Sequence, residues 1–411
     1  MRITRCRICK SEDLYKFLDL GMHPPSDAFL KKDQLDSVEE KFPLDVYFCG
    51  SCCLVQLGFV VPPEKLFTKN YVYVSSISTT MRSNWMDMAA EINKKFGVPE
   101  GSLVVDIGGN DGTLLKCFHD SGFSVTTLNI DPSDVAKTKV SEDVDVINDF
   151  FSENVASEVA KKFGKARIIT GTNVFAHVDD LDDFMRGVGA LLEDDGVLVL
   201  EFPYLMDLLE KIEFDTIYHE HLSYLSVGPL IKLYERFGMI IVDIDRIPVH
   251  GGSLRIFVKK KGLGTVAAKN VQDLVRLEKE RGLYDLETYK DFSVRVSNLK
   301  KNLVAMLRDL KSGGKKIAGD TAPAKGNTLL NYCGIDDNVL DFIAEINPIK
   351  QGLYTPGTHI PVVPLEKIYE DKPDYLLILA WNFKDDIMRQ QKDFRESGGR
   401  FIVPVPEPEI V

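Results

Sequence analysis

A glycine-rich segment between a short apolar strand and a helix constrains the fold of this chain more than any other feature. Residues 103–106 predict a buried strand, and residues 113–119 predict the first turns of a helix. Between them stand Gly108, Gly109 and Gly112, and residues without a Cβ let a backbone approach a ligand closely. A strand, a glycine turn and a helix in this order are typical of a parallel sheet covered by helices, so an α/β domain is expected here.

The strands that follow predict how this sheet ends. Further apolar strands are expected at residues 125–130, 167–170, 197–202, 240–245 and 254–259. Helical segments separate the earlier strands, which favours a parallel arrangement. Only a short segment around Gly251 and Gly252 separates the last two strands, and because it is too short for a crossover helix, they are expected to be antiparallel. A parallel sheet with a terminal antiparallel hairpin resembles the class I methyltransferase domain.

The spacing of the glycines separates two classes of cofactor. A nicotinamide-binding loop reads GxGxxG, and Gly108, Gly109 and Gly112 do not match that pattern. Asp106, Gly108 and Gly112 instead match the D-x-G-x-x-x-G loop that methyltransferases place around S-adenosylmethionine. Asp106 is expected to face the amino-acid end of that cofactor. Asp131 follows at the end of the next strand, where an acid accepts hydrogen bonds from both ribose hydroxyls.

Four further residues are candidates for the same cofactor. Asn110 belongs to the glycine loop, and Asn173 follows the fourth strand, at the edge where ligands sit in open α/β sheets. Asp149 and Phe150 follow the third strand and are candidates for bracketing the adenine. A solvated acid and a core aromatic residue explain these two equally well, so the sequence leaves both interpretations open.

Two cysteine pairs near the N-terminus predict a zinc site. Cys6 and Cys9 form one C-x-x-C pair, and Cys49 and Cys52 form the other. Four thiolates at this spacing satisfy tetrahedral zinc and leave no open coordination position, so the metal is expected to be structural. Cys53 is expected to be a bystander in the second turn. The sequence between the pairs is loop-like, which predicts a small irregular module.

A short segment after the fifth strand concentrates ionisable side chains. It contains Tyr218, His219, Glu220, His221 and Tyr224. Histidine is the usual general base near neutral pH, a neighbouring carboxylate orients it, and a tyrosine donates to a developing oxyanion. This density favours a catalytic site over a surface histidine pair. A metal site is the weaker alternative, because two histidines two residues apart point to opposite faces of a strand and no third ligand is evident.

Two other segments are candidates for the same cleft. His177 follows the fourth strand and is placed to reach the histidine segment, although a structural role is equally frequent for a lone histidine. Tyr71 and Tyr73 stand where the zinc module meets the cofactor domain. They suit a lid over the site, but tyrosines two residues apart are as typical of a half-buried strand.

The C-terminal third predicts a second α/β unit. Residues 269–311 are charged and helical, and strands are expected at 316–319, 339–346, 375–380 and 401–405. A turn of small residues after the first strand carries Lys325 and Asn327, and such a turn presents backbone N–H groups and a lysine to an anion. It is not a Walker A loop. A tight turn with an exposed lysine is the alternative. Asn382 lies in another loop at a strand end.

These patterns divide the chain into residues 1–66, a zinc module, 67–262, a methyltransferase domain, and 263–411, a Rossmann-like domain. The net charge of −12 argues against a nucleic-acid surface, which needs positive potential. No run of 18 apolar residues predicts a membrane span, and no apolar signal core follows the N-terminus. We therefore expect a cytoplasmic protein with reduced thiols, either a monomer or a homodimer.

Taken together, these motifs resemble the sugar C-methyltransferases of deoxysugar biosynthesis over nearly the whole chain. The residues that carry the resemblance, besides the cysteine pairs and the D-x-G-x-x-x-G loop, are Leu54-Val55-Gln56, Tyr218-His219-Glu220-His221, Gly251-Gly252-Ser253-Leu254-Arg255, the segment 322–327 and the segment 354–358. The resemblance implies a structural zinc, S-adenosylmethionine in the central domain, and a nucleotide-diphosphate-linked 4-keto sugar held with help from a degenerate Rossmann-like C-terminal domain. Thymidine diphosphate is the expected nucleotide.

The resemblance also implies residue roles. His221 is the general base, which removes the proton beside the sugar ketone and gives an enediolate that attacks the methyl sulfonium. Tyr218 and Glu220 support that step, while His177 and Tyr71 or Tyr73 line the sugar site. The remaining substrate-binding candidates are Tyr224, Ser253, Arg255, Lys325, Asn327 and Asn382.

Two other functions remain as alternatives. O- or N-methylation of a sugar or small metabolite needs the same cofactor loop and a base beside a hydroxyl or amine, but it does not remove a substrate C–H proton. A zinc-ribbon protein that modifies nucleic acid belongs to another class. The acidic net charge and the lack of clustered Lys and Arg near the cysteines count against it.

Overall fold

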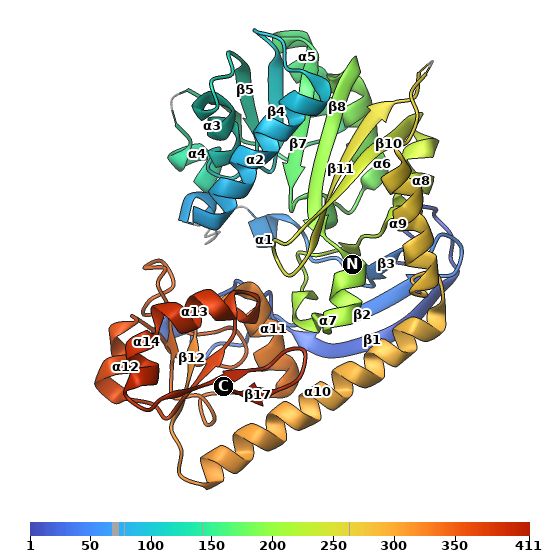
Figure 1. Cartoon of the computed structure of the whole chain (residues 1–411). Coiled ribbons are helices and arrows are strands. Elements are labelled where there is room, and N and C mark those ends of the chain that lie inside the picture. Colours follow the sequence, from blue (N-terminus) through green and yellow to red (C-terminus); the bar gives the residue numbers. More distant parts are fainter. Residues whose placement is uncertain (68–73, 78, 142, 263) are drawn as a thin grey trace.

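The computed structural model describes residues 1–67, 74–77, 79–141, 143–262 and 264–411, which fold into an α/β protein with three sheets. Figure 1 shows a four-stranded N-terminal sheet lying between a seven-stranded central sheet and a six-stranded C-terminal sheet. Tyr71 and Tyr73, expected at a lid, lie outside the described residues.

The N-terminal sheet has the order β1-β2-β3-β9. Its elements, with the short helices of this region, are β1 (Leu14–His23), η1 (Lys32–Gln34), β2 (Phe42–Cys49), β3 (Val55–Leu57), α1 (Glu64–Phe67) and β9 (Ser223–Tyr224). The expectation of an irregular module was wrong, because β1 and β2 pair as antiparallel strands from Leu14 and Cys49 to His23 and Phe42. Register shifts along the pair interrupt the alternation of apolar residues that marks a strand. The sheet takes β9 from far beyond residue 66.

The central sheet has the order β10-β11-β8-β7-β4-β5-β6. Its strands are β4 (Leu103–Ile107), β5 (Thr126–Ile130), β6 (Asp145–Ile147), β7 (Ala166–Thr172), β8 (Leu192–Pro203), β10 (Met239–Ile247) and β11 (Ser253–Lys260). The five strands β4 to β8 are parallel. The expected antiparallel hairpin is confirmed, since β11 runs antiparallel to both β10 and β8.

Helices cover both faces of the central sheet (Figure 1). The helices of this part of the chain are η2 (Ser75–Ile77), α2 (Thr79–Phe96), α3 (Thr113–Asp120), α4 (Asp134–Lys139), α5 (Glu153–Phe163), η3 (Phe175–His177), α6 (Leu181–Leu191), α7 (Leu205–Lys211), η4 (Phe214–Thr216) and α8 (Val227–Arg236). On one face, Trp85 of α2 and Phe118 of α3 pack with Val104 and Phe257 of the sheet in a separate core cluster. On the other, Phe184 of α6 belongs to the larger cluster.

The C-terminal sheet has the order β14-β13-β12-β15-β16-β17, and all but β17 run parallel. Its strands are β12 (Ile317–Asp320), β13 (Ile343–Ala344), β14 (Val362–Val363), β15 (Tyr375–Ile378), β16 (Arg400–Val403) and β17 (Glu409–Ile410). Counted along the chain, the parallel strands are ordered 3-2-1-4-5, as in doubly wound folds that bind ligands beyond the carboxyl ends of their strands. The strand expected at 339–346 is only two residues long.

The predicted helical stretch before this sheet is divided into two helices. The helices of the region are α9 (Lys269–Glu280), α10 (Leu286–Ser312), α11 (Ala324–Cys333), α12 (Glu366–Asp371), η5 (Trp381–Phe383), α13 (Lys384–Gln390) and α14 (Lys392–Glu396). The long helix α10 runs from the central part to the C-terminal sheet (Figure 1), and its Tyr289 packs against the rings of Phe17 and Phe48. It thereby ties the N-terminal sheet to both neighbours.

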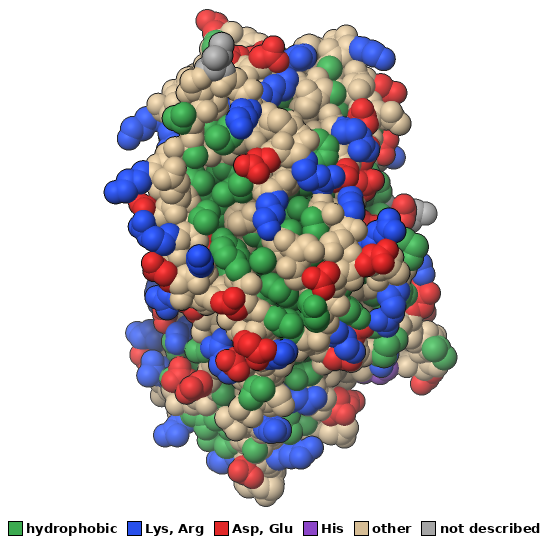
Figure 2. All heavy atoms as spheres, turned by 90° about the vertical axis from the view of Figure 1, so that its right-hand side faces the viewer, with side chains coloured by type: hydrophobic (Ala, Val, Ile, Leu, Met, Phe, Trp, Pro, Cys, Tyr) green, Lys and Arg blue, Asp and Glu red, His purple; other side chains and the backbone are tan. Residues whose placement is uncertain are grey.

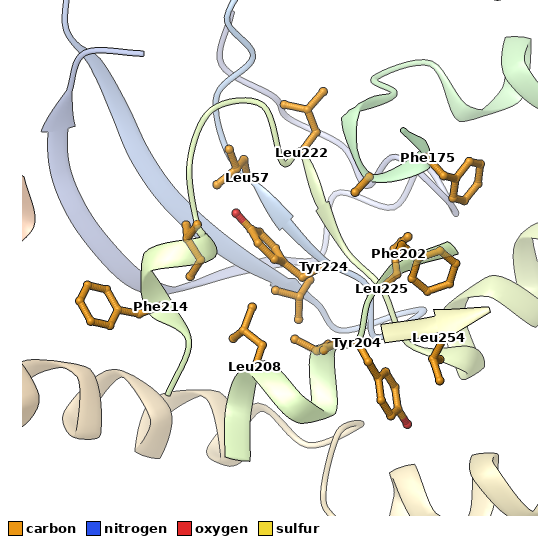
Figure 3. Close-up of a cluster of buried hydrophobic side chains, with 14 of the residues drawn as sticks. Leu57, Phe175, Phe202, Tyr204, Leu208, Phe214, Leu222, Tyr224, Leu225 and Leu254 are labelled. Atoms are coloured by element: carbon orange, nitrogen blue, oxygen red, sulfur yellow. The ribbon is translucent and has the colours of Figure 1, made fainter. Parts of the chain in front are cut away.

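One buried apolar cluster joins the N-terminal sheet to the central one. Figure 3 shows Leu57 of β3, Leu222 and Tyr224 beside β9, and Phe214 of η4 around the same core. Strand β9, which follows the histidine segment, therefore belongs to the core that connects the two sheets. On the surface, Figure 2 shows lysine and arginine side chains interspersed with acidic ones over one face. No helix within the described part of the chain is long and apolar enough to cross a membrane.

Candidate active site

The four predicted zinc ligands converge. The Sγ atoms of Cys6, Cys9, Cys49 and Cys52 lie within 4.8 Å of one another, with Cys6 3.4 Å from Cys52 and Cys9 3.5 Å from Cys49. Tetrahedral zinc with its usual Zn–S distance places sulfur atoms about 3.8 Å apart, so the quartet fits the ion. It is the one such group among the described residues, which leaves His219 and His221 without the third ligand that a metal needs.

Both cysteine turns have the same backbone geometry. The N–H of Lys10 donates to the carbonyl of Cys6 at 3.0 Å, and the N–H of Cys53 donates to the carbonyl of Cys49 at 2.8 Å. Lys10 and Cys53 adopt φ angles of 61° and 67°. Cys53 therefore closes the second turn.

The glycine loop lies where the parallel strands of the central sheet end. Asp106, at the end of β4, is buried and accepts a hydrogen bond from the Thr170 hydroxyl at 2.8 Å through Oδ1. Its Oδ2 has no partner within the described chain, and burial raises its pKa to about 7. A Cβ on Gly109 would lie 2.5 Å from that Oδ2, and one on Gly108 would lie 2.7 Å from Val174. An unpartnered acceptor beside a backbone cradle fits a bound S-adenosylmethionine.

Asp131 holds the same loop from the neighbouring strand. Its Oδ2 accepts from the N–H of Asn110 at 2.9 Å, and its Oδ1 accepts from the N–H of Ser133 at 2.8 Å. Asn110 and Asn173 both adopt left-handed backbones, with φ of 52° and 55°. Asp149 is exposed at the same edge of the sheet, with Phe150 half-buried beside it. The structure therefore brings the predicted cofactor residues to one edge, and their individual contacts stay predictions.

The histidine segment forms a turn rather than the expected strand. Residues 218–221 are not in a strand, and β9 begins only at Ser223. His221 Nδ1 lies 2.8 Å from the carbonyl oxygen of Thr216. Because a carbonyl oxygen only accepts, Nδ1 carries the proton and Nε2 keeps its lone pair. Thr216 thus orients His221, a role that the sequence had suggested for Glu220.

Aromatic rings surround His221. The His177 ring stacks on it with centroids 5.1 Å apart, and the Tyr218 ring lies 4.0 Å away. Phe67 stacks on the other side of His177 at 5.3 Å. The expectation that His177 reaches the same cleft agrees with this geometry.

Burial keeps this group of histidines neutral. It lowers the pKa of His221 to about 4 and that of His177 well below its ordinary value. Burial likewise lowers the pKa of His250, in the β10–β11 turn, to about 4, and this residue acts electrostatically on His221. The Nε2 atoms of His177 and His250 are buried without a hydrogen-bond partner in the described chain. A neutral imidazole with a free lone pair is the state that a general base requires.

Glu220 and His219 point toward the N-terminal part rather than toward His221. The Ser26 hydroxyl donates to Glu220 Oε2 at 3.2 Å, and burial followed by the nearby Asp27 raises the pKa of Glu220 to about 8. His219 lies edge-on to the Phe42 ring. Tyr224 is buried, and its hydroxyl has no hydrogen-bond partner in the described residues.

A cavity of about 530 Å³ separates the central part from the C-terminal sheet. Its central side comes from α7 and the β10–β11 hairpin, and its other side from residues that follow β15 and β16. It is lined by Asp207, Lys211, Arg246, Ile247, Pro248, Gly251, Gly252, Trp381, Asn382, Lys384, Asp385, Val405 and Pro406. Three cations against two acids give the lining a positive balance, and Asp207 pairs with two of the cations, Lys211 and Arg246, at 3.0 and 3.1 Å. The volume falls in the usual range of small-molecule sites.

Lys325 lies behind this cavity, next to acids. Its Nζ is 4.2 Å from the Trp381 ring centroid, and burial lowers its pKa while Asp215 and Glu213 oppose that shift. Trp381 Nε1 donates to Asp215 Oδ2 at 2.7 Å. Burial raises the pKa of Glu213 to about 7. A lysine offset by two nearby carboxyl groups attracts an anion less than an uncompensated one.

Three predicted substrate residues have partners within the protein. Arg255 is buried, and its Nη2 lies 2.9 Å from a carboxylate oxygen of the fully buried Glu201. The Ser253 hydroxyl donates to the Val249 carbonyl at 3.0 Å. The Asn327 side chain donates to the Ser26 carbonyl at 2.7 Å. Their roles in substrate binding stay predictions.

The sequence missed several residues of this region. Thr216 acts through its carbonyl, which no side-chain pattern reveals. His250 stands next to the paired glycines 251–252, and that position was the available signal. Lys211, Arg246 and Lys384 come from separate elements that only the packing of the two parts brings together.

Three protein families match successive parts of the chain. A zinc binding domain family matches residues 6–67, a methyltransferase domain family matches residues 80–244, and a family described as C-methyltransferase C-terminal domain matches residues 248–406.

A full-length relative and solved structures also match. The C-methyltransferase NovU of Streptomyces niveus is 35% identical over 410 residues, which cover 100% of this chain and 97% of the relative. A solved S-adenosylmethionine-dependent methyltransferase of Anabaena variabilis is 17% identical, with a TM-score of 0.35 over 45% of this chain and 86% of its own. One from Clostridium acetobutylicum is 14% identical, with a TM-score of 0.35 over 44% of this chain and 92% of its own.

Proposed function

Because the chain belongs to the family of S-adenosylmethionine-dependent C-methyltransferases with an N-terminal zinc-binding module, we propose that it methylates a carbon atom of a nucleotide-diphosphate-linked 4-keto sugar. The observation that carries the proposal is the state of His221. Its Nδ1–H is fixed on the Thr216 carbonyl, so Nε2 is a neutral base. Methylation of carbon needs such a base, whereas transfer to a nucleophilic oxygen or nitrogen does not need a C–H bond to break.

In the proposed reaction, His221 Nε2 takes the proton from the carbon beside the sugar ketone. The C–H electron pair becomes the double bond of an enediolate, and the negative charge moves to the former ketone oxygen. His177 is half-buried beside His221, and burial lowers its pKa so that it is neutral, which supports a role for one ring N–H as the donor to that oxygen. Bound S-adenosylmethionine supplies an electrophilic methyl group, which the nucleophilic carbon displaces from sulfur. Asp106, the glycine loop and Asp131 hold that cofactor.

The protein also shields the half-buried base from water. His221 and His177 stack between Tyr218 and Phe67, and burial lowers the pKa values of both imidazoles. A dry site strengthens each hydrogen bond to the developing enediolate. Glu220, whose raised pKa keeps it protonated near neutral pH, supports the turn through Ser26 without placing a negative charge beside the enediolate.

The cavity between the central part and the C-terminal sheet is the proposed site of the nucleoside diphosphate. It lies beyond the carboxyl ends of β15 and β16, where doubly wound sheets bind ligands. Lys211, Arg246 and Lys384 supply positive charge. His250 and Gly251 belong to one turn, and this turn connects the cavity to the surroundings of His221. The sugar is thereby expected to reach the base while the nucleotide occupies the cavity.

Hydrogen exchange in a substrate tests the proposed chemistry. A thymidine-diphosphate 4-keto sugar incubated in deuterated water with the enzyme and S-adenosylhomocysteine is expected to gain one deuterium at the carbon beside the ketone. With S-adenosylmethionine, the same carbon gains a methyl group. Mass spectrometry and proton NMR report both. Methyl transfer to oxygen or nitrogen without C–H exchange would establish the alternative reaction, and neither exchange nor transfer would reject this substrate class.

Substitutions that remove one positive charge distinguish the two candidate phosphate sites. Lys384→Met is expected to weaken thymidine diphosphate binding by about 10-fold, because it removes a charge-assisted contact. Arg246→Met is expected to weaken this binding less, since Asp207 pairs with Arg246 at 3.1 Å. Lys325→Met is expected to change it less than about 3-fold, since two nearby acids offset that lysine. Lys367→Met, on the far helix α12, is the matched control. Calorimetric titration measures the affinities, and a large loss confined to Lys325→Met would move the diphosphate to that lysine.

A further inference from the structure

The zinc turns contact the strand that follows His221. The second C-x-x-C turn ends three residues before β3, and β3 pairs with β9 through Val55 with Tyr224 and Gln56 with Ser223. The N–H of Leu57 donates to the Leu222 carbonyl at 2.9 Å. The backbone directly after His221 is therefore hydrogen-bonded to a strand that the zinc ligands anchor.

The same backbone position holds the segment of His177. The N–H of Leu222 donates to the carbonyl of Ala176 at 2.8 Å. Leu222 is thus bonded to Leu57 on one side and to the neighbour of His177 on the other. His221 and His177 are therefore each adjacent in sequence to a residue of this hydrogen-bonded chain, His221 to Leu222 and His177 to Ala176.

Arg7, which lies between the first two zinc ligands, contacts both outer segments. Its side chain is buried, and its Nη1 donates to the Leu57 carbonyl at 2.9 Å and to Gln56 Oε1 at 3.2 Å. Its Nε donates to Asp179 Oδ1 at 3.0 Å, two residues after His177. One guanidinium therefore links the zinc turn to the strand beside His221 and to the segment of His177.

We propose that Arg7, held by the zinc turn, is a positioning residue that sets the relative placement of His221 and His177. The zinc then contributes to proton abstraction by fixing the backbone on which both imidazoles are mounted, and it takes no part in the chemistry. The role of the two histidines rests on the proposed function, but the mechanical link does not.

Hydrogen–deuterium exchange of the zinc-loaded, full-length protein tests this link without substrate. In Arg7→Met, backbone amides of residues 218–226 and 175–179 are expected to exchange about 10-fold faster or more, because local opening governs exchange. Zinc content stays at one per chain, and affinity for S-adenosylhomocysteine changes less than about 2-fold, since the glycine loop lies elsewhere. Arg5→Met is the matched control. Arg5 precedes Cys6 and pairs only with the exposed Glu12 among the described residues, so wild-type exchange is expected.

Steady-state kinetics supply the second readout. Arg7→Met is expected to lower kcat about 10- to 100-fold with little change in KM, as displacement of a base by about 1 Å does. Arg7→Lys keeps the charge but has a single nitrogen, which cannot reach Leu57 and Asp179 together. This variant is expected to recover part of the kcat that Arg7→Met loses. If Arg7→Met does not fold, Asp179→Ala removes the acceptor from one end of the link and is expected to speed exchange in residues 175–179.

The outcomes separate the inference from the proposed function. Wild-type exchange in both segments of folded Arg7→Met, or in residues 175–179 of Asp179→Ala where that variant replaces it, would overturn the link. Faster exchange together with weakened cofactor binding and unchanged kcat would also overturn it, because it would show general destabilisation. Failure of the wild-type enzyme to exchange a sugar proton would reject the proposed function, while the amide exchange would still decide the placement of the two histidines.

Discussion

Replacing His221 with asparagine is expected to lower kcat by about 1000-fold, within the range that general-base catalysis contributes. Asparagine keeps a donor for the Thr216 carbonyl but has no lone pair basic enough to take a proton from carbon. The methylation rate and the rate of deuterium entry into the substrate should fall together, because both need the same abstraction. Binding of S-adenosylhomocysteine should be unaltered.

His119→Asn is the matched control for this substitution. His119 lies on α3, where its Nε2 is 3.1 Å from the Thr127 hydroxyl, away from the His221 turn. The kcat of His119→Asn is expected to lie within about 2-fold of the wild-type value. If His221→Asn still exchanges the substrate proton at the wild-type rate, another residue is the base, and His177 becomes the first candidate.

The pH profile provides an independent check on the same residue. Burial lowers the pKa of His221 to about 4, so the imidazole is neutral and competent at all higher pH values. The acid limb of kcat/KM is therefore expected near pH 4 to 5 instead of near the ordinary histidine value of about 6.5. Between those values, activity stays level as long as the protein remains folded and S-adenosylmethionine is saturating, so that titration of Asp106, whose pKa burial raises to about 7, does not limit cofactor binding. A limb near 6.5 would show that the base is exposed to water.

The sequence predicted the features that contiguous motifs encode. The cysteine pairs, the glycine loop after β4 and the segment of Tyr218 to His221 each lie within a few residues, so local motifs singled them out. The convergence of the cysteines is confirmed, while the role of the histidine segment stays a prediction. The terminal hairpin followed from the short connection at Gly251 and Gly252. Local rules were sufficient in these cases, because each feature is determined by neighbouring residues.

The features that the sequence did not predict depend on distant pairing. The sequence predicts loops where β1 and β2 form, because register shifts break their alternation. The two-residue strand β9 has no sequence pattern of its own and is defined only by its pairing with β3. The orientation of His221 comes from the backbone of Thr216. The cavity needs α7, the β10–β11 turn and η5 to meet, and no local pattern gives their packing. Sequence reasoning therefore identified the chemical groups better than their surroundings.

Substituting Glu278 with leucine is expected to lower the free energy of unfolding by about 3–5 kcal/mol, because each buried donor left without an acceptor costs about 1–3 kcal/mol and the site can relax only in part. Glu278 is fully buried on α9 and accepts four hydrogen bonds. Tyr204 donates at 2.9 Å and Tyr284 at 2.5 Å, while the N–H groups of Val227 and Gly228, at the start of α8, donate at 2.7 and 3.1 Å. Leucine would leave all four donors buried without an acceptor.

Glu278 supports elements that lie next to the active site, so the lower stability should appear when these elements unfold and not in the folded site. Tyr204 precedes α7, and the N–H of Leu205 donates to the Leu225 carbonyl directly after β9 at 3.0 Å. Figure 3 shows Tyr204 and Leu225 on the same side of the cluster that contains Tyr224. We therefore expect Glu278→Leu to weaken S-adenosylhomocysteine binding only at temperatures or urea concentrations where the central part unfolds.

Urea unfolding followed by circular dichroism measures the free energy of unfolding. The relevant transition is the one at which S-adenosylhomocysteine binding is also lost. Glu278→Gln keeps one acceptor and is expected to lose only about 1–3 kcal/mol, because its amide nitrogen faces donors. Glu280 lies two residues further along the same helix, and its side chain is exposed. Glu280→Leu should therefore change the free energy of unfolding by less than about 0.5 kcal/mol. Equal losses in Glu278→Leu and Glu280→Leu would mean that helix propensity, rather than the four buried donors, determines the cost.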